Sequence, residues 1–469
     1  MTSARRSRAG ATLLIALVTA AMVLVSAGAT GVHDRLVRSE PAQDETLHAV
    51  PSVLRLTFSR EVTLEAARVH LEGPAGPMAL RPLTLEADSP AILLASVGGS
   101  WQAGVHSVAW QILGADGHPV NGEFKFVVAE GAAGLAPPDD AELPPVTVNE
   151  VDASDALPSF GPESPLYVAV RWLWFASLIG VLGVITFRLA VLGRIPSTEP
   201  GIARALPAAA ALAARIGIVC SAIALLAAFL RLVAQRVSVG IEAGILINAT
   251  TWGHGWLLHV GAASLALIGF AIARRDRRQG WLLAIPAALA LAFAPALSGH
   301  AVATEPVALN VLADAVHVIG AGGWLGTLLL VMFAGIATAY RAGENRDRII
   351  AALVRAFSPL ALVFAGIVAA TGVFSAWQHL GSLGALFSSD YGQALLWKLG
   401  ALAMVVGFGA YNFLRIQPNL PDGAASHRLR RSAALELATA ALVLLLTSVL
   451  VATPPPSDEM PMAQMTDGP

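Results

Sequence analysis

The sequence predicts an all-β domain followed by an all-α bundle of eight membrane-spanning helices. Residues 33–128 contain short β-rich runs punctuated by Gly, Pro and Asp, whereas the chain from Leu166 onward consists mainly of apolar stretches of helical length. The chain is 55% hydrophobic and only 13% charged, while soluble domains carry about 25% charged residues. Much of it is therefore expected to lie in lipid.

Composition excludes several classes of function. Cys220 is the only cysteine, so neither a disulfide framework nor a cysteine-based zinc site can form. Lys125 and Lys398 are the only lysines, and no basic surface for nucleic acid is predicted. The sequence lacks a phosphate-cradling glycine loop and a GxSxG motif. We expect neither a nucleic-acid partner nor an enzyme.

Residues 1–32 are predicted to form an export signal. Arginines near the N-terminus precede an apolar core at Leu13–Val25, and small residues provide a cleavage site after Ala29 or near Val32. Retention of this segment as an uncleaved anchor is the alternative. In either case the β domain that follows is expected to lie outside the cytoplasmic membrane.

The domain at 33–128 is predicted to be an antiparallel β-sandwich, because its apolar residues alternate along short runs. The runs are SVLRLTFSR, ARVHLEG, AILLASV, HSVAWQIL and GEFKFVVA. Residues 129–164 are rich in Pro, Ala, Asp and Glu, which predicts an extended acidic linker. The membrane domain is assigned to residues 165–453.

Eight stretches of this domain are long and apolar enough to span a bilayer. They cover approximately residues 166–190, 205–233, 254–273, 281–298, 308–338, 350–376, 391–415 and 430–452. Arginines concentrate in the loops after the odd-numbered spans. The positive-inside rule then predicts a multi-pass protein of the bacterial cytoplasmic membrane, with the β domain and the C-terminal tail outside.

The fifth span carries an unusual polar stripe. Its members, spaced four, three, four and three apart, are Asn310, Asp314, His317, Ala321 and Trp324. Gly320, Gly322 and Gly323 predict a close approach by another helix. Ionisable groups inside a membrane are costly and often mark a functional site. The alternative is an Asp–His hydrogen bond that only holds two helices together.

Other charged residues in the predicted spans should also face the bundle interior. They are Arg171, Arg215, Arg231, Lys398 and Glu436. Lys398 is predicted to pair with Asp314, which would leave His317 available for a metal, and Glu436 to pair with Arg215. His254, His300 and His379 are predicted near the outer ends of spans, and His259 and His317 deeper within them.

Two further segments contain residues suited to copper. Asp116 and His118 flank a glycine in a predicted turn between strands, and together with His33 they suit a tetragonal Cu(II) ion. The tail at 454–469 contains Met460, Met462 and Met465, whose thioethers suit Cu(I). A tail with incidental methionines is the alternative.

These motifs resemble a known pair of families. HDRLVRSEPA at 33–42, LRLTFS at 54–59 and DGHPVNG at 116–122 resemble the periplasmic copper-binding protein CopC. The membrane part resembles its partner CopD in SGHA at 298–301, DAVHVIGAGGWLG at 314–326, YGQALLWKLG at 391–400 and RLRRSAALELA at 428–438. The order of the motifs is that of CopC–CopD fusion proteins.

The resemblance implies a Greek-key β-sandwich and a Cu(II) site built from His33 with its free amine, Asp116 and His118. Cleavage after Ala29 would leave three residues ahead of His33 and displace the amine ligand. The methionine-rich Cu(I) site of some CopC proteins is expected to be absent, because Met78 is the only methionine in this domain.

The leading hypothesis is copper transport, with import favoured by ligands that lie toward the outside. The bundle would accept the copper ion at His300, Asp314 and His317, with His254 and His259 as secondary candidates. Other periplasmic copper proteins are candidate partners. Two alternatives remain open. One is copper sequestration outside the membrane without transport, and the other is a redox protein with haem ligated by histidines such as His259 and His317.

Overall fold

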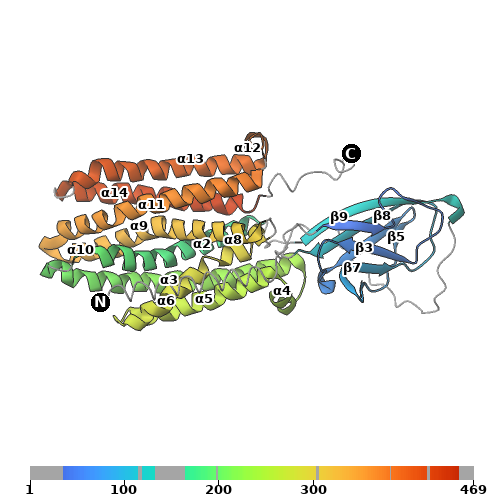
Figure 1. Cartoon of the computed structure of the whole chain (residues 1–469), viewed down its shortest axis with the longest axis horizontal. Helices are drawn as coiled ribbons and strands as arrows, with labels where there is room; N and C mark the ends of the chain where they lie inside the picture. Colours follow the sequence, from blue (N-terminus) through green and yellow to red (C-terminus); the bar gives the residue numbers. More distant parts are fainter. Residues whose placement is uncertain are drawn as a thin grey trace.

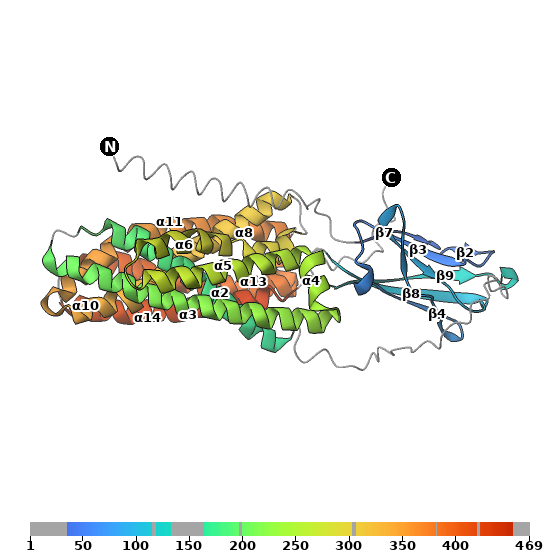
Figure 2. The ribbon, with the colours of Figure 1, turned by 90° about the horizontal axis from the view of Figure 1, so that it is seen from below.

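The computed structural model describes residues 35–114, 119–132, 164–196, 199–302, 306–380, 382–419 and 423–453. Figure 1 shows an elongated molecule in which a helical bundle is followed, along the long axis, by a β domain. The perpendicular view in Figure 2 shows the same arrangement. The predicted export signal, most of the acidic linker and the methionine-containing tail lie outside the described residues.

The β domain consists of two sheets. Its strands are β1 (Leu36–Glu40), β2 (Thr46–Leu47), β3 (Val53–Phe58), β4 (Arg68–Gly73), β5 (Gly76–Met78), β6 (Thr84–Glu86), β7 (Ser89–Ser96), β8 (Gly104–Leu113) and β9 (Pro119–Val128). One sheet has the order β1-β3-β7-β6 and the other β2-β9-β8-β4-β5. All pairings are antiparallel except the short parallel pair β2–β9.

The core of this domain lies between the two sheets, because alternate residues of each strand point toward the other sheet. Leu54 and Leu56 of β3 and Leu93 of β7 contribute from one sheet, and Val108 and Phe126 from the other. All five side chains are fully buried. The predicted β-sandwich is therefore confirmed, and its five predicted runs coincide with β3, β4, β7, β8 and β9.

The described residues of the membrane domain form helices joined by short connections. Its α-helices are α2 (Pro165–Thr186), α3 (Pro200–Val239), α4 (Ala243–Ala249), α5 (Thr251–Ala273), α6 (Arg278–Leu291), α7 (Ala294–Leu297), α8 (Val307–Ala321), α9 (Thr327–Leu330), α10 (Ala337–Arg341), α11 (Arg346–Leu380), α12 (Ala385–Ser388), α13 (Asp390–Tyr411) and α14 (Gly423–Leu450). Within the described residues, 8 continuous helical segments are long and apolar enough to cross a membrane. The predicted eight-helix bundle is confirmed.

Several of these segments include π-helical turns. They are η3 (Phe187–Val191), η6 (Gly322–Gly326), η7 (Val331–Ile336) and η9 (Asn412–Ile416). Two of them, η6 and η7, join α8, α9 and α10 into the single fifth span Val307–Arg341. Single π-helical turns inside α-helices are rare and frequently lie at functional sites.

Local sequence explains where the spans begin and end. Ser164 caps α2 by accepting a hydrogen bond from the Tyr167 amide, with proline at the first helical position. Ser389 caps α13 in the same way. At the other end of a span, Gly240 terminates α3 in the left-handed conformation (φ 71°), which glycine adopts without steric cost.

The predicted close approach at the glycines of the fifth span is confirmed. A side chain on Gly322 would overlap Leu182 of α2, and one on Gly323 would overlap the ring of Phe364 on α11. The backbones of Gly326 and Gly183 touch directly. The fifth span is thus held tightly between α2 and α11, which fixes the position of the polar residues on α8.

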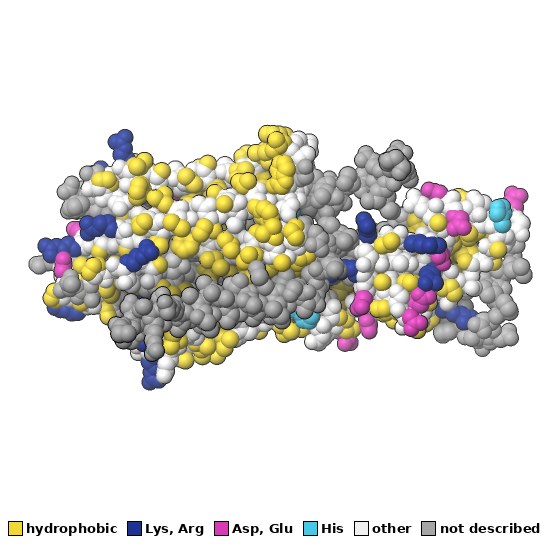
Figure 3. Space-filling model, viewed as in Figure 1, with side chains coloured by type: hydrophobic (Ala, Val, Ile, Leu, Met, Phe, Trp, Pro, Cys, Tyr) yellow, Lys and Arg dark blue, Asp and Glu magenta, His cyan; other side chains and the backbone are white. Residues whose placement is uncertain are grey.

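The β domain contacts the bundle through the end of β8 and through Ala66. Leu113, the last residue of that strand, joins a buried cluster with Ile241, Leu246 of α4 and Trp252 of α5. Leu113 is 5% exposed and Trp252 2%. We call this end of the bundle the β-proximal end and the opposite end the β-distal end. The exposed arginines gather at the β-distal end, as Figure 3 shows.

Candidate functional site

The intramembrane polar site lies in the β-proximal half of the bundle, where α8 packs on α11 and α13 runs alongside (Figure 1). Asp314 and His317 lie about two and three turns into α8, which begins at Val307. Both side chains are half-buried. The stripe predicted on this helix therefore faces polar residues of neighbouring helices.

The Asp314 carboxylate has three polar neighbours. It interacts with the Ser375 hydroxyl of α11, and electrostatically with His379 of the same helix and with Lys398 of α13. Lys398 is half-buried, and the carboxylate partly balances its charge. Lys398 therefore lies close enough to Asp314 for the two charges to interact, which is consistent with the predicted pairing.

His317 is held by α11 through one ring nitrogen. Its Nδ1 atom lies 2.9 Å from the Thr371 Oγ1 atom. The Thr371 hydroxyl donates its own proton to the Ile367 carbonyl oxygen at 2.7 Å. Because a hydroxyl has only one proton to donate, Nδ1 must be the donor to Thr371. The neutral ring then carries its lone pair on Nε2, the atom that can bind a metal ion or a proton.

Further polar contacts extend the site toward the β-proximal end. The Gln378 Nε2 atom donates to Asn310 Oδ1 at 3.2 Å, which ties α11 to α8. The His379 ring, whose Nδ1 lies 2.7 Å from the Ser375 carbonyl oxygen, stacks on Tyr391 of α13 with 6.0 Å between centroids. A polar face of α11 therefore meets the stripe on α8, and the sequence analysis did not identify it.

The structure places His300 only by its backbone, in the short 3-10 helix η5 (His300–Val302). Its side chain is outside what the structure describes. Ser298, two residues earlier, accepts a hydrogen bond from Arg231 Nη2 at 2.9 Å and donates to the Ala294 carbonyl at 2.7 Å. The serine of the SGHA motif therefore ties this segment to α3.

A second buried polar cluster lies between α2, α3 and α5. The Arg231 guanidinium lies 3.5 Å from the centroid of the Trp174 ring, and His259 stacks on the same ring system at 5.7 Å. Arg231 is 2% exposed and His259 is fully buried. His259 contacts α2, whereas His317 contacts α11.

The three residues of the predicted outer Cu(II) site, His33, Asp116 and His118, lie outside the described residues. The strands before and after the segment of Asp116 and His118, β8 and β9, are described and pair with each other. Leu113 of β8 pairs with Pro119 of β9, and the same Leu113 belongs to the buried cluster that includes Trp252 of the bundle. The chain segment that carries two of the predicted ligands therefore starts at the contact between the two domains.

One predicted pairing is wrong. Arg215 lies on the exposed face of α3 and is not a partner of Glu436. Glu436, which is 3% exposed, instead accepts a hydrogen bond from Asn412 Nδ2 at 2.9 Å and interacts with Trp324. Neutral donors on η9 and η6 thus replace the expected cation, because Arg215 faces outward.

No group of three or more His, Cys, Asp or Glu side chains suited to a metal occurs within the residues that the structure describes. Two of the three predicted bundle ligands, Asp314 and His317, lie near each other on one helix, and the third is His300, whose side chain is not described. A metal site with three ligands at this position would therefore need a ligand beyond these two.

Comparison with known proteins agrees with both parts of this architecture. A family model for the CopC domain matches residues 36–129. A model for the N-terminal domain of copper resistance protein D-like proteins matches residues 162–310, and one for copper resistance protein D matches residues 351–450. These matches, together with the eight spans, indicate a multi-pass membrane protein of the copper transport and resistance class.

Similar proteins carry corresponding names. The chain is 23% identical to the copper transport protein CutJ of Bacillus subtilis (strain 168) over 92% of this chain and 75% of that protein. It is 25% identical to copper resistance protein D of Pseudomonas syringae pv. tomato over 60% of this chain and 94% of that protein. The crystal structure of CopC from Methylosinus trichosporium OB3b matches with 24% identity, covering 21% of this chain and 95% of that chain at a TM-score of 0.20. The chain therefore combines CopC and CopD domains, which is the domain combination of CopC–CopD fusion proteins.

Proposed function

We propose that this protein captures copper outside the cytoplasmic membrane and carries it inward through the helical bundle. The outer ligands are His33, Asp116 and His118, and the bundle accepts the ion at Asp314 and His317 with His300 as a third ligand. The coarser function, copper transport or resistance, follows from the family. The direction and the residues are the proposal.

The observation that carries the proposal is the hydrogen bond from His317 Nδ1 to Thr371. Histidines that bind metals usually donate their other ring nitrogen to a fixed acceptor, which selects the tautomer and orients the ring. Thr371 provides that acceptor, since its own proton is committed to Ile367. His317 is therefore prepared to bind a cation through Nε2, next to the negative charge of Asp314.

Lys398 has a defined role in this proposal. Its ammonium group interacts with Asp314 when the site holds no metal, which limits the cost of both charges in the membrane. A copper ion bound by Asp314 would compete with Lys398 for the same carboxylate. Copper binding would then weaken the Asp314–Lys398 interaction and free α13 to move relative to α8.

The direction is supported by charge and by placement. Exposed arginines gather at the β-distal end of the bundle (Figure 3), and arginine-rich ends face the cytoplasm. The polar site of α8, α11 and α13 lies in the opposite half, near the β domain. A copper ion released by the β domain would therefore meet Asp314 and His317 early on its way in.

The test is cellular copper, measured by elemental analysis at low external copper, in cells that express the wild type, His317→Ala or Asp314→Asn. The matched control is His70→Ala, which removes an exposed histidine of the β domain. Import predicts that wild type and the control raise cellular copper, while the two bundle variants do not. Lower copper in wild-type cells would indicate export, and equal copper in all strains would favour sequestration outside the membrane.

A further inference from the structure

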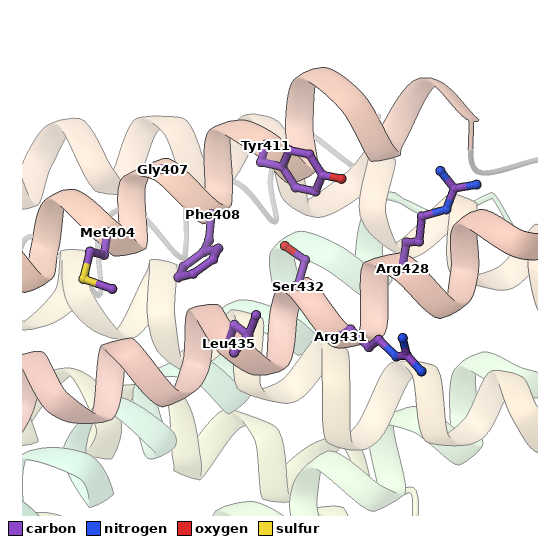
Figure 4. A pocket seen from close by; sticks show the side chains of 8 residues that line it. All are labelled: Met404, Gly407, Phe408, Tyr411, Arg428, Arg431, Ser432 and Leu435. Carbon is purple, nitrogen blue, oxygen red and sulfur yellow. The ribbon is translucent and has the colours of Figure 1, made fainter.

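A groove between α13 and α14 lies at the β-distal end of the bundle, away from the polar site. It encloses about 570 Å³. Figure 4 shows its side chains, which separate into an apolar part around Met404, Phe408 and Leu435 and a polar part around Tyr411 and Ser432. Arg428 and Arg431 complete the polar part. With an apolar part and a polar part side by side, the groove is suited to an amphiphilic ligand.

The polar part contains a buried hydrogen-bonding group with no partner. Ser432 is 7% exposed, and its Oγ atom has no hydrogen-bond partner within the described residues. A buried hydroxyl without a partner costs about 1–3 kcal/mol, so such groups usually meet a ligand or water. In Figure 4 the Ser432 hydroxyl and the Tyr411 ring face each other across the groove.

The polar part is also cationic. Arg428 and Arg431 are exposed at the rim of the groove, whereas Arg430 between them turns away and lies 5.7 Å from the ring of Tyr340. Two guanidinium groups and two hydroxyls can together donate several hydrogen bonds to phosphate oxygens. A phosphodiester therefore fits this end of the groove.

The groove faces the lipid. In the apolar stretch of the α13 span only 17% of the residues are buried inside the protein. The corresponding share in the fifth span is 72%. α13 is thus an outer helix, and its surface is covered by acyl chains in a membrane. At Gly407 no atom lies within 4 Å of the position that a Cβ would occupy, so the apolar part is open.

We propose that this groove binds one anionic phospholipid of the cytoplasmic leaflet. Its phosphate is held by Arg428, Arg431 and the hydroxyls of Ser432 and Tyr411, and one acyl chain lies along Met404, Phe408 and Leu435. The groove opens at the arginine-rich end of the bundle, where anionic lipids and basic side chains meet in bacterial membranes. The site is independent of the proposed copper route.

The test is native mass spectrometry of the full-length protein in detergent, with phosphatidylglycerol or phosphatidylcholine of the same acyl chains. The proposal predicts one tightly bound phosphatidylglycerol and much weaker binding of phosphatidylcholine. Arg428→Gln/Arg431→Gln should weaken phosphatidylglycerol binding roughly 25-fold, at about fivefold per arginine. Ser432→Ala should weaken it about fivefold.

Two further variants separate the groove from general effects. Arg274→Gln/Arg275→Gln removes the same charge from exposed arginines outside the groove and should leave binding unchanged. Gly407→Leu keeps all charges but fills the apolar part, and it should abolish retention of the lipid while the helix is preserved.

Several outcomes would overturn the proposal. One is equal weakening by the two arginine pairs, which would mean a diffuse charge effect. Another is equally tight binding of inorganic phosphate or glycerol phosphate, which would make this a site for a soluble anion. A third is a lipid-free dimer that Gly407→Leu dissociates, since a second copy of the chain would then occupy the groove.

Discussion

The Nδ1 atom of His317 lies 2.9 Å from Oγ1 of Thr371, one helix away, and that hydroxyl gives its proton to the Ile367 carbonyl. The arrangement fixes the tautomer of a histidine that lies about three turns into a membrane span. It also shows that the candidate copper site depends on α11 as well as on α8. The orientation of His317 can therefore be tested without changing His317.

Thr371→Val should weaken copper binding in the bundle. The substitution keeps the shape of the side chain but removes the acceptor for Nδ1, so the ring can rotate and change tautomer. Loss of such a partner typically costs a factor of about 10–100 in metal affinity. Competition titration with a copper chelator, on protein that also carries Asp116→Ala and His118→Ala, isolates the bundle site.

The control for this prediction is Thr439→Val. Thr439 also donates to a carbonyl four residues earlier, at 2.9 Å, but has no histidine beside it. The copper affinity of the Thr439→Val variant should equal that of the parent protein. If both valine variants bind copper as the parent does, Thr371 does not orient a metal ligand.

Much of the fold was predictable because its signals are local. Length and hydropathy predicted the eight spans, and alternation predicted the five longer strands. The sequence analysis missed β1, β2, β5 and β6, which have 2–5 residues and are fixed by pairing across the sheet rather than by their own pattern. The parallel pairing of β2 with β9 is likewise a tertiary effect.

The site was predictable only in part. Spacing along one helix identified Asp314 and His317, and similar depth suggested Lys398 as a neighbour of Asp314. The same spacing rule would have found Thr371, Ser375 and Gln378, which recur four and three residues apart on α11. The pairing of Arg215 with Glu436 failed because depth does not reveal which way a side chain faces, and Arg215 faces outward.

Trp174→Ala should strongly destabilise the bundle. Trp174 is 5% exposed and its ring lies under the buried guanidinium of Arg231 at 3.5 Å. Removing it creates a cavity and deprives a buried cation of its aromatic neighbour, at a cost of about 4 kcal/mol or more. Trp397→Ala removes the same side chain at a 73% exposed position and should cost less than about 0.5 kcal/mol. Thermal unfolding in detergent compares the two variants, and equal shifts would contradict the prediction.

Acid should destabilise the β domain through His106. This side chain is fully buried between Trp101 and Phe126, with Nδ1 3.2 Å from the Gly104 carbonyl oxygen. Burial lowers the pKa of His106 below its ordinary value, and the contact with Gly104 offsets this only in part. Below about pH 6.5 the imidazole of His106 therefore binds a proton in the unfolded chain but stays neutral in the folded domain.

The free energy of unfolding of the β domain should accordingly fall between about pH 7.5 and about pH 5.5. His106→Phe should remove most of that slope, whereas His70→Gln, at an exposed position, should leave it unchanged. The domain has a core of its own, so residues 35–132 can be unfolded by urea as a fragment at each pH. If the free energy of unfolding falls equally with decreasing pH in the wild type, His106→Phe and His70→Gln, His106 is not the source of the pH dependence.

Leu113→Ala should slow copper uptake without weakening copper capture. Leu113 is the last residue of β8 and belongs to the buried cluster that contains Trp252 and Leu246 of the bundle. Truncating it removes apolar area from the contact between the domains, which loosens the docking of the β domain on the bundle. At limiting copper the uptake rate should fall, while the equilibrium copper affinity of the β domain should stay the same.

The matched control is Leu71→Ala, which makes the same truncation inside the β-sandwich, where Leu71 is 2% exposed. Both truncations cost about 2–5 kcal/mol where the leucine is fully packed. Of the two leucines, Leu113 belongs to the cluster shared with the bundle and Leu71 to the core of the β-sandwich. Leu71→Ala should lower the stability of the β domain at least as much as Leu113→Ala does. If copper transfer depends on docking of the β domain on the bundle, Leu113→Ala should nevertheless slow copper uptake more than Leu71→Ala. Equal uptake by the two variants would mean that copper reaches Asp314 and His317 from solution rather than from the docked β domain.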